Sequence, residues 1–457
     1  MAAQKLSLTF HGGAKAVTGA NYLLEYGDSK ILIDCGLHQG SNFSERQNFE
    51  PFPYKPSEID AVFVTHAHID HIGRIPQLYR AGFKGKVYST PPTRDFAEFL
   101  LLDSEHLLRQ EAQKKKRTPL YTAQDVMDVM QSWKGIPYHI PITEGDFSVE
   151  LYDAGHVLGS SSILVTVAGK RIVFSGDLGN IPEPLIKPTE YIEEADYALI
   201  ESTYGNRVHE KLDVRKDLLE DAIEDTVKTG GTLMIPAFAL ERTQELLFEL
   251  NELVENGRIP KVPIFIDSPL AIKLTAVYQK YSSDPLYFNQ TSRKLIQSGD
   301  HIFNFPGLVF TLTTEQSKEI NVVQGPKVIV AGAGMSNGGR ILHHEMRYLS
   351  DPKSRILFIG YQANGSLGRQ VLDGAAAVKI FGETIPVRCR KLAIGGYSAH
   401  ADQPQLLKWI ESMRVSLKRV FVIQGEEDQA LPLAQKIRDD LAVEAEVPSP
   451  SDRVMLQ

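Results

Sequence analysis

The segment 65–71 constrains this chain more than any other feature of its sequence. It reads Thr-His-Ala-His-Ile-Asp-His and follows an apolar run, which predicts that it lies at the end of a β-strand. His66 and His68 are two residues apart, so they point the same way if the chain stays extended. Asp70 and His71 follow where a helix is expected to begin. Imidazole and carboxylate groups gathered in this way predict a zinc site, and a chance polar turn is the alternative interpretation.

Two later segments supply candidate ligands to complete such a site. His156 lies in the glycine-containing stretch 153–159, and Asp177 lies in Ser-Gly-Asp-Leu-Gly at 175–179, each after an expected strand. The glycines allow close approach of the backbone. Taken alone, His156 reads as an ordinary loop histidine and Asp177 as a turn aspartate. The metal-site interpretation therefore requires that both strands end at the same edge of the fold as 65–71.

The rhythm of the sequence predicts two kinds of architecture. Residues 1–205 read as short strands joined by glycine turns with few helices, which favours a layered α/β sandwich. From about residue 213 strands and helices alternate, as in a parallel α/β sheet, so we expect a second domain at 206–385. The tail 386–457 returns to one strand and two helices. The expected strands of the first part are 6–10, 20–26, 30–34, 61–65, 149–153, 162–167, 171–175 and 197–201, with helices at 94–116 and 122–133.

Composition excludes several classes of protein. Of the 457 residues, 42% are hydrophobic and 23% are charged, which is ordinary globular composition and excludes general disorder. The formal net charge of -8 argues against a protein that coats nucleic acid or membranes by bulk charge. A local cleft lined by basic residues or by a metal remains compatible with this charge. Only two cysteines are present, Cys35 and Cys389, which excludes a disulfide framework and favours the reducing cytoplasm. We expect no signal peptide and no membrane-spanning helix.

The glycine-rich stretch 332–340 is a candidate anion site. It resembles a dinucleotide-binding loop, but Asn337 takes the place of the third glycine, so we expect no nucleotide cofactor. Backbone amides at the start of the following helix favour an anion, and a substrate phosphate with Ser336 and Arg340 beside it is the expected occupant. Arg242 is a second candidate. Each arginine is otherwise a structural ion-pair partner.

Together these segments resemble a known family. The His-x-His-x-Asp-His segment and the loops around His156 and Asp177 resemble the metallo-β-lactamase fold. Glu-Ser-Thr-Tyr-Gly at 201–205 and Gly-Tyr-Ser-Ala-His-Ala-Asp at 396–402 resemble the acidic and histidine motifs that the β-CASP nucleases add. Further segments that resemble this family lie at 8–12, 33–36, 235–245, 267–271, 334–340 and 360–363. The resemblance spans essentially the whole chain, and it is nearest to the polyadenylation endonuclease and its compact bacterial and archaeal counterparts.

The resemblance implies both a fold and a set of metal ligands. The fold is an αββα metallo-β-lactamase sandwich formed by 1–205 and 386–457, with the β-CASP domain at 206–385 inserted as a parallel α/β sheet. The expected ligand set is His66, His68 and His156 for one zinc ion, Asp70 and His71 for a second, and Asp177 as the bridge between them.

One position departs from the family pattern. The family places a final histidine ligand after the last strand, and Gln424 stands there in this chain. An amide oxygen is a weaker and harder ligand than imidazole. The sequence therefore leaves open two zinc ions, a weak second site, a second site that accepts Mn²⁺, and a Gln424 that only forms hydrogen bonds.

The implied function is a metal-dependent endoribonuclease acting on single-stranded RNA. A metal-bound hydroxide would attack the phosphodiester, His400 would act as general acid, Glu201 would orient its ring, and Asp70 would belong to both the catalytic and the metal-binding set. Three alternatives stay open: a DNA nuclease of the same family, a small-molecule hydrolase, which the inserted domain disfavours, and a catalytically weakened RNA-binding partner subunit. The sequence does not determine the oligomeric state, and a homodimer is one of the possibilities.

Overall fold

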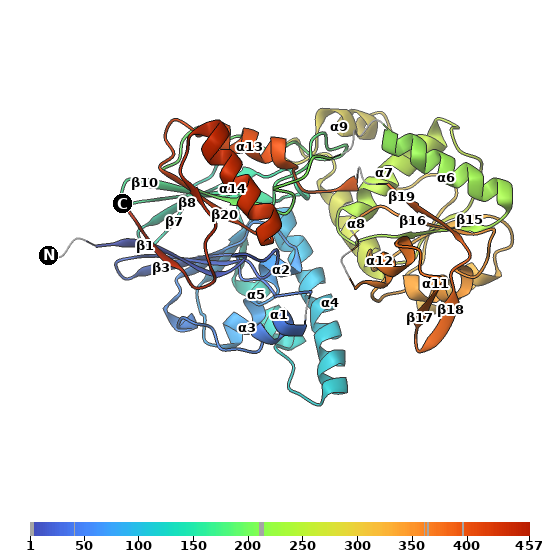
Figure 1. Ribbon diagram of the computed structural model, residues 1–457, viewed down its shortest axis with the longest axis horizontal. Coiled ribbons are helices and arrows are strands. Elements are labelled where there is room, and N and C mark those ends of the chain that lie inside the picture. Colours follow the sequence, from blue (N-terminus) through green and yellow to red (C-terminus); the bar gives the residue numbers. More distant parts are fainter. Residues whose placement is uncertain (1–3, 41, 210–213, 361, 363–364, 395–396) are drawn as a thin grey trace. The chain divides into compact units, whose positions relative to one another are not determined.

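The computed structural model describes residues 4–40, 42–209, 214–360, 362, 365–394 and 397–457, and its elements are labelled in Figure 1. Three residues of the motifs quoted above, Tyr361, Ala363 and Gly396, lie outside the described residues. Within the described ranges, no helix combines the length and the apolar character needed to cross a bilayer. The chain divides into two compact units, which are unit 1 with residues 1–183, 187–208 and 400–457, and unit 2 with residues 184–186 and 209–399.

The first sheet of unit 1 carries the histidine-rich segment at one edge. Its strand order is β22 (Arg453–Leu456), β1 (Leu6–Gly12), β2 (Asn21–Tyr26), β3 (Ser29–Ile33), β4 (Ala61–Phe63), β5 (Lys86–Ser89) and β6 (Trp133–Gly135). Strands β22, β1, β2 and β3 pair antiparallel, whereas β3, β4, β5 and β6 pair parallel. Since parallel strands end at the same edge, the loops after β3 and β4 emerge side by side.

The second sheet of unit 1 carries the remaining candidate ligands. Its order is β21 (Ala445–Glu446), β20 (Arg419–Ile423), β11 (Tyr197–Glu201), β10 (Lys170–Phe174), β9 (Ser161–Val167), β8 (Phe147–Asp153) and β7 (Ile142–Glu144). Strands β10, β11, β20 and β21 pair parallel, and β7 to β10 pair antiparallel. The carboxyl ends of β10, β11 and β20 therefore share one edge.

Helices cover the outer faces of both sheets, which confirms the expected αββα sandwich (Figure 1). Between the sheets, the rings of Phe10 and Phe421 lie with centroids 5.4 Å apart. On the outer face of the second sheet, Leu406 and Trp409 are buried in a core shared with strand β20. The helices on that face are α13 (Gln403–Glu411) and α14 (Glu427–Leu441), and those beside the first sheet are α1 (Asn42–Gln47), α2 (Ile69–Ile72), α3 (Ile75–Arg80), α4 (Pro91–Lys115) and α5 (Ala123–Ser132).

Unit 2 is built on the parallel sheet that the alternating sequence predicted. Its strand order is β14 (Leu308–Phe310), β13 (Ile264–Ile266), β15 (Lys327–Ala331), β12 (Thr232–Pro236), β16 (Arg355–Phe358) and β19 (Arg390–Ala393), and neighbouring strands all pair parallel. A separate hairpin joins β17 (Ala377–Ile380) to β18 (Glu383–Pro386). The helices are α6 (Arg215–Thr229), α7 (Arg242–Glu255), α8 (Pro269–Tyr281), α9 (Gln290–Gln297), α10 (Thr314–Glu319), α11 (Ile341–Tyr348) and α12 (Leu367–Leu372).

The unit boundaries differ from the domain boundaries that the sequence suggested. The compact units divide at 208/209 and 399/400, whereas the sequence pattern placed the divisions at 205/206 and 385/386. Strand β19 accounts for the second difference, because it pairs with β16 in the sheet of unit 2. Its first two residues are Arg390 and Lys391, so it lacks the apolar run by which strands are found in sequence.

A carboxyl group is fully buried in unit 2. Glu345 on helix α11 is 0% exposed, and the Ser336 hydroxyl donates a hydrogen bond to its Oε1 atom. Burial raises the pKa of Glu345 to about 8, and the hydrogen bond from Ser336 offsets part of this rise. The folded chain therefore holds a proton on Glu345 at a pH where the unfolded chain releases it.

This proton predicts a pH-dependent stability. The contribution of protonated Glu345 to the free energy of unfolding is present at low pH. It falls as the pH rises from the ordinary glutamate range through about 8, because unfolding then releases a proton. Glutamine has nearly the same shape as protonated glutamic acid but does not ionise. When the pH is raised from about 5.5 to about 8.5, Glu345→Gln should therefore lose less thermal stability than the parent. Melting temperatures across this range check it, with the exposed Glu255→Gln of α7 as control. Equal slopes for the parent and Glu345→Gln would contradict the assignment.

Candidate metal centre

The loop after β4 is held by a buried aspartate at the end of β3. Asp34 accepts hydrogen bonds from the Thr65 backbone N–H to Oδ1 and from the Thr65 hydroxyl to Oδ2, each at 2.8 Å. The Nδ1 atom of His71 lies 2.7 Å from the same Oδ2 atom. Asp34 thus fixes the direction in which His71 presents its other ring nitrogen.

The second sheet reaches the same loop through the segments that carry His156 and Asp177. Ser161 at the start of β9 donates to the Thr65 carbonyl from its backbone N–H at 2.7 Å and from its hydroxyl at 3.0 Å. Gly176 has φ +59, and a Cβ there would lie only 2.8 Å from the Cβ of Thr65. The glycine is therefore required for the loop after β10 to approach the loop after β4.

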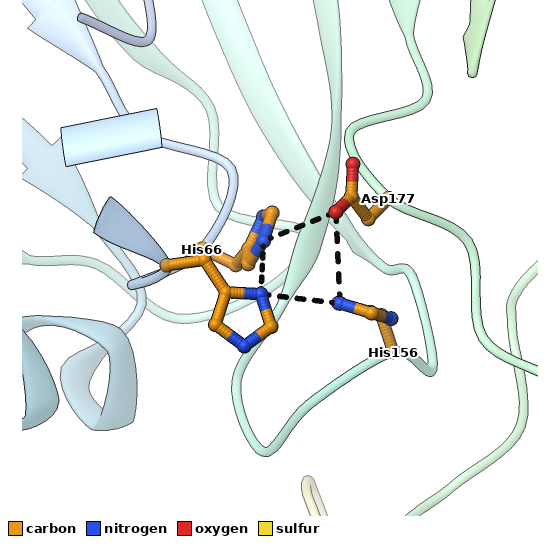
Figure 2. Close-up of side chains that lie close together, drawn as sticks. His66, His156 and Asp177 are labelled. Atoms are coloured by element: carbon orange, nitrogen blue, oxygen red, sulfur yellow. Dashed lines mark hydrogen bonds and ion pairs between the residues drawn. The ribbon is translucent and has the colours of Figure 1, made fainter. Parts of the chain in front are cut away.

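Four potential ligand atoms converge where these loops meet. The donor atoms of His66, His68, His156 and Asp177 all lie within 4.8 Å of one another. The Nδ1 atom of His68 is 3.0 Å from His66 Nε2 and 3.3 Å from His156 Nε2. Asp177 Oδ2 is 3.4 Å from His66 Nε2 and 3.6 Å from His156 Nε2. Figure 2 shows His66, His156 and Asp177 pointing toward one another.

This geometry fits a divalent cation. Ligands about 2.0–2.1 Å from a tetrahedral zinc ion lie about 3.3 Å apart, and the four separations just given, from 3.0 to 3.6 Å, are close to that value. Burial and the charge of His66 lower the pKa of His68, and burial and His400 lower the pKa of His156. Burial raises the pKa of Asp177, but His71 and His66 outweigh it and hold the pKa well below its ordinary value. For His68, His156 and Asp177, these directions favour neutral imidazoles beside an ionised carboxylate, which are the protonation states that a metal requires.

On the other side of Asp177 the arrangement is different. His71 Nε2 lies 3.4 Å from Asp177 Oδ1 and 3.9 Å from Asp70 Oδ2. Burial lowers the pKa of His71, whereas Asp177, Asp34 and Asp70 raise it well above its ordinary value, so this pocket attracts positive charge. The side-chain amide nitrogen of Gln424 lies 2.8 Å from Asp177 Oδ1 and 2.9 Å from His71 Nε2.

His400 and Glu201 meet at the rim of the same centre. They are 199 residues apart in sequence, yet His400 Nδ1 lies 3.2 Å from Glu201 Oε1. The rings of His400 and His156 have centroids 4.6 Å apart. Burial lowers the pKa of His400, but Glu201, Asp177 and Asp70 outweigh it and raise the pKa to about 9. A cation bound by Asp177 acts in the opposite direction.

Comparison with known families agrees with this architecture. Residues 15–202 match the metallo-beta-lactamase superfamily, 243–371 match the Beta-Casp domain, and 384–448 match the Zn-dependent metallo-hydrolase RNA specificity domain. The chain is 37% identical to ribonuclease TTHA0252 of Thermus thermophilus, over 93% of this chain and 94% of that protein. The chain belongs to the β-CASP family of metallo-β-lactamase ribonucleases.

Other members of the family are similar over nearly the whole chain. The RNase J-like protein of Methanocaldococcus jannaschii is 33% identical, over 96% of this chain and 97% of that protein. The transcription termination factor FttA of Methanosarcina mazei is 32% identical, over 96% of this chain and 70% of that protein. A crystal structure of a protein of unknown function from Enterococcus faecalis matches with a TM-score of 0.57 at 14% identity, covers 99% of this chain and 100% of its own, and shows the fold alone.

The β-CASP residues that the sequence suggested for substrate binding are all paired within unit 2. Arg340 donates to Asp267 Oδ1 at 2.7 Å and to the backbone carbonyls of Thr311 and Leu312, each at 2.9 Å, and its side chain is 21% exposed. Arg242 is buried and ion-paired with Glu241 and Glu245. Ser336 is buried and donates to Glu345.

Sequence reasoning missed the contacts that hold the candidate metal ligands of unit 1 in place. Thr65 and Ser161 are not candidate ligands, yet the hydrogen bonds between them join the two sheets at the centre. The sequence shows a polar residue at the end of each apolar strand. This pattern does not indicate with which other side chain that residue forms a hydrogen bond.

The geometry predicts that His156 is required for metal binding. His156→Ala should lower the metal content per chain by at least about tenfold, because losing a direct ligand should cost no less than losing an outer hydrogen-bond partner. Elemental analysis of purified, dialysed protein measures this. His106→Ala, at an exposed position on α4, should keep the parent content. Full metal content in His156→Ala would show that the ion binds elsewhere.

Proposed function

We propose that this protein is a zinc-dependent endoribonuclease that hydrolyses phosphodiester bonds of single-stranded RNA. The similarity to proteins named as ribonucleases and to an RNA specificity domain supports a nuclease that acts on RNA. The observation that carries the proposal is the cluster of His66, His68, His156 and Asp177 with His400 beside it.

The four clustered residues would hold the zinc ion. A bound divalent cation supplies Lewis acidity, which polarises a phosphate oxygen and makes water a stronger acid. Asp70, whose side chain is 19% exposed beside His71, would accept a hydrogen bond from the attacking water. This role agrees with its position at the rim of the pocket.

His400 would protonate the leaving oxygen. Its Nδ1 atom faces Glu201, so the proton available to a substrate sits on Nε2. Glu201 is 0% exposed, and its Oε1 atom also accepts a hydrogen bond from the Leu178 backbone N–H at 2.8 Å. Because Glu201 is fixed in this way, it orients the imidazole and favours its protonated form.

Unit 2 would contribute phosphate contacts. Arg340 is the strongest candidate, because its guanidinium is partly exposed and lies just before helix α11. Arg242 and Ser336 would act by shaping the loops around it, since both are buried. A homodimer and a cytoplasmic location complete the proposal, and the free thiols of Cys35 and Cys389 agree with a reducing compartment.

The acid assignment predicts a separation of metal binding from activity. His400→Ala should keep its zinc but cleave RNA about 10²–10⁴-fold more slowly, which is the usual contribution of a general acid. The rate is measured on end-labelled single-stranded RNA, with DNA of equal sequence as the competing substrate and His106→Ala as control. Cleavage by His400→Ala at the parent rate would disprove its role as general acid. Faster cleavage of DNA than of RNA by the parent would show that DNA is the substrate.

A further inference from the structure

Gln424 is held in one position at the end of β20. Its backbone has φ 48, its N–H donates to the Gly13 carbonyl at 2.6 Å, and its carbonyl accepts from the Thr203 hydroxyl at 3.2 Å. The residue is 2% exposed. A Cβ added at Gly13 would lie only 3.3 Å from the Cγ of Gln424, so the glycine allows the two segments to approach closely.

The amide of Gln424 joins two of the groups expected at a second metal position. Asp177 Oδ1 is an ionised acceptor, so the atom 2.8 Å away from it must be the amide nitrogen rather than the amide oxygen. In its neutral form, which a metal-binding state requires, His71 places Nδ1–H toward Asp34, and Nε2 can then accept the other amide hydrogen at 2.9 Å. One NH₂ group therefore satisfies both a carboxylate and an imidazole.

The acidic groups around this amide are satisfied without a second cation. Asp34 accepts from the Thr65 backbone, the Thr65 hydroxyl and His71. Asp70 keeps 19% of its side chain exposed to solvent. Asp177 receives the Gln424 amide on Oδ1, while its Oδ2 atom faces His66 and His156. The amide hydrogens supply partial positive charge at the point where a second ion would otherwise be needed.

We propose that the Gln424 amide closes the second metal position, so that each chain binds one zinc ion tightly, at His66, His68, His156 and Asp177. This inference rests on the proposed metal centre and not on the proposed substrate. It distinguishes this chain from a relative with a histidine at the same place.

Binding a second ion would require the amide to turn. Its oxygen would have to face the metal, which breaks the hydrogen bonds to both Asp177 and His71. Zinc is rarely bound by an amide oxygen, so the new bond does not offset that loss.

Substitution by histidine should reopen the position. Histidine tolerates the left-handed backbone better than most residues, and it offers a ring nitrogen where glutamine offers N–H. After zinc loading and dialysis, the parent should contain one zinc per chain and Gln424→His should contain two. Titration of the metal-free proteins with zinc against a chromophoric chelator should show the second equivalent about 100-fold weaker in the parent.

Controls make the outcomes distinct. Gln113→His, which adds a histidine to the exposed face of α4, should bind one zinc, and circular dichroism checks that each variant folds. If Gln424→His does not fold, Gln424→Glu offers a ligand oxygen at unchanged size and should also gain a second zinc. Two tight ions in the parent, whether Zn²⁺ or Mn²⁺, would overturn the proposal, as would a single ion in a folded Gln424→His. No ion in any variant would instead overturn the metal centre of the proposed function.

Discussion

The structure depends on the burial of histidine and aspartate side chains, the candidate metal ligands, where two sheets meet. Imidazole nitrogens and a carboxylate that are removed from water need partners, and isolated groups of this kind are costly to bury. Here the donor atoms of three histidines and Asp177 all lie within 4.8 Å of one another, so one cation could be a partner to all four. The loops that carry them are joined by hydrogen bonds between Ser161 and Thr65, so the site and the packing of the two sheets stabilise each other.

The topology explains why distant parts of the sequence contribute to one centre. The parallel strands β10, β11 and β20 end at the same edge, and Asp177, Glu201 and Gln424 each lie at or just past one of those ends. His400 joins them because its backbone forms a β-bridge with Gly179, directly after the Asp177 loop. The sequence of unit 1 is interrupted by the residues of unit 2. The segment 400–457 nevertheless returns to the same sheet and supplies His400 and Gln424 to the edge that carries Asp177 and Glu201.

The sequence was sufficient to predict the fold and the candidate ligands. It was insufficient to predict which side chains form hydrogen bonds or ion pairs with them. The apolar strands and the polar residues at their ends are local patterns, so the αββα sandwich and the parallel sheet were both predicted and confirmed. Strand β19 was missed because two of its four residues are charged. For Gln424 the sequence left ligation and hydrogen bonding open, because the choice depends on Asp177 and His71, which lie 247 and 353 residues away. Arg242 and Arg340 were likewise ambiguous until their carboxylate partners were located.

X-ray absorption at the zinc edge reports the atoms around the ion itself, and so shows whether these four side chains bind it. We expect a nearest shell of nitrogen and oxygen at about 2.0–2.1 Å with the outer scattering of three imidazole rings. A nearest shell of oxygen alone without imidazole scattering, or a sulfur shell at about 2.3 Å, would contradict a centre built from His66, His68, His156 and Asp177.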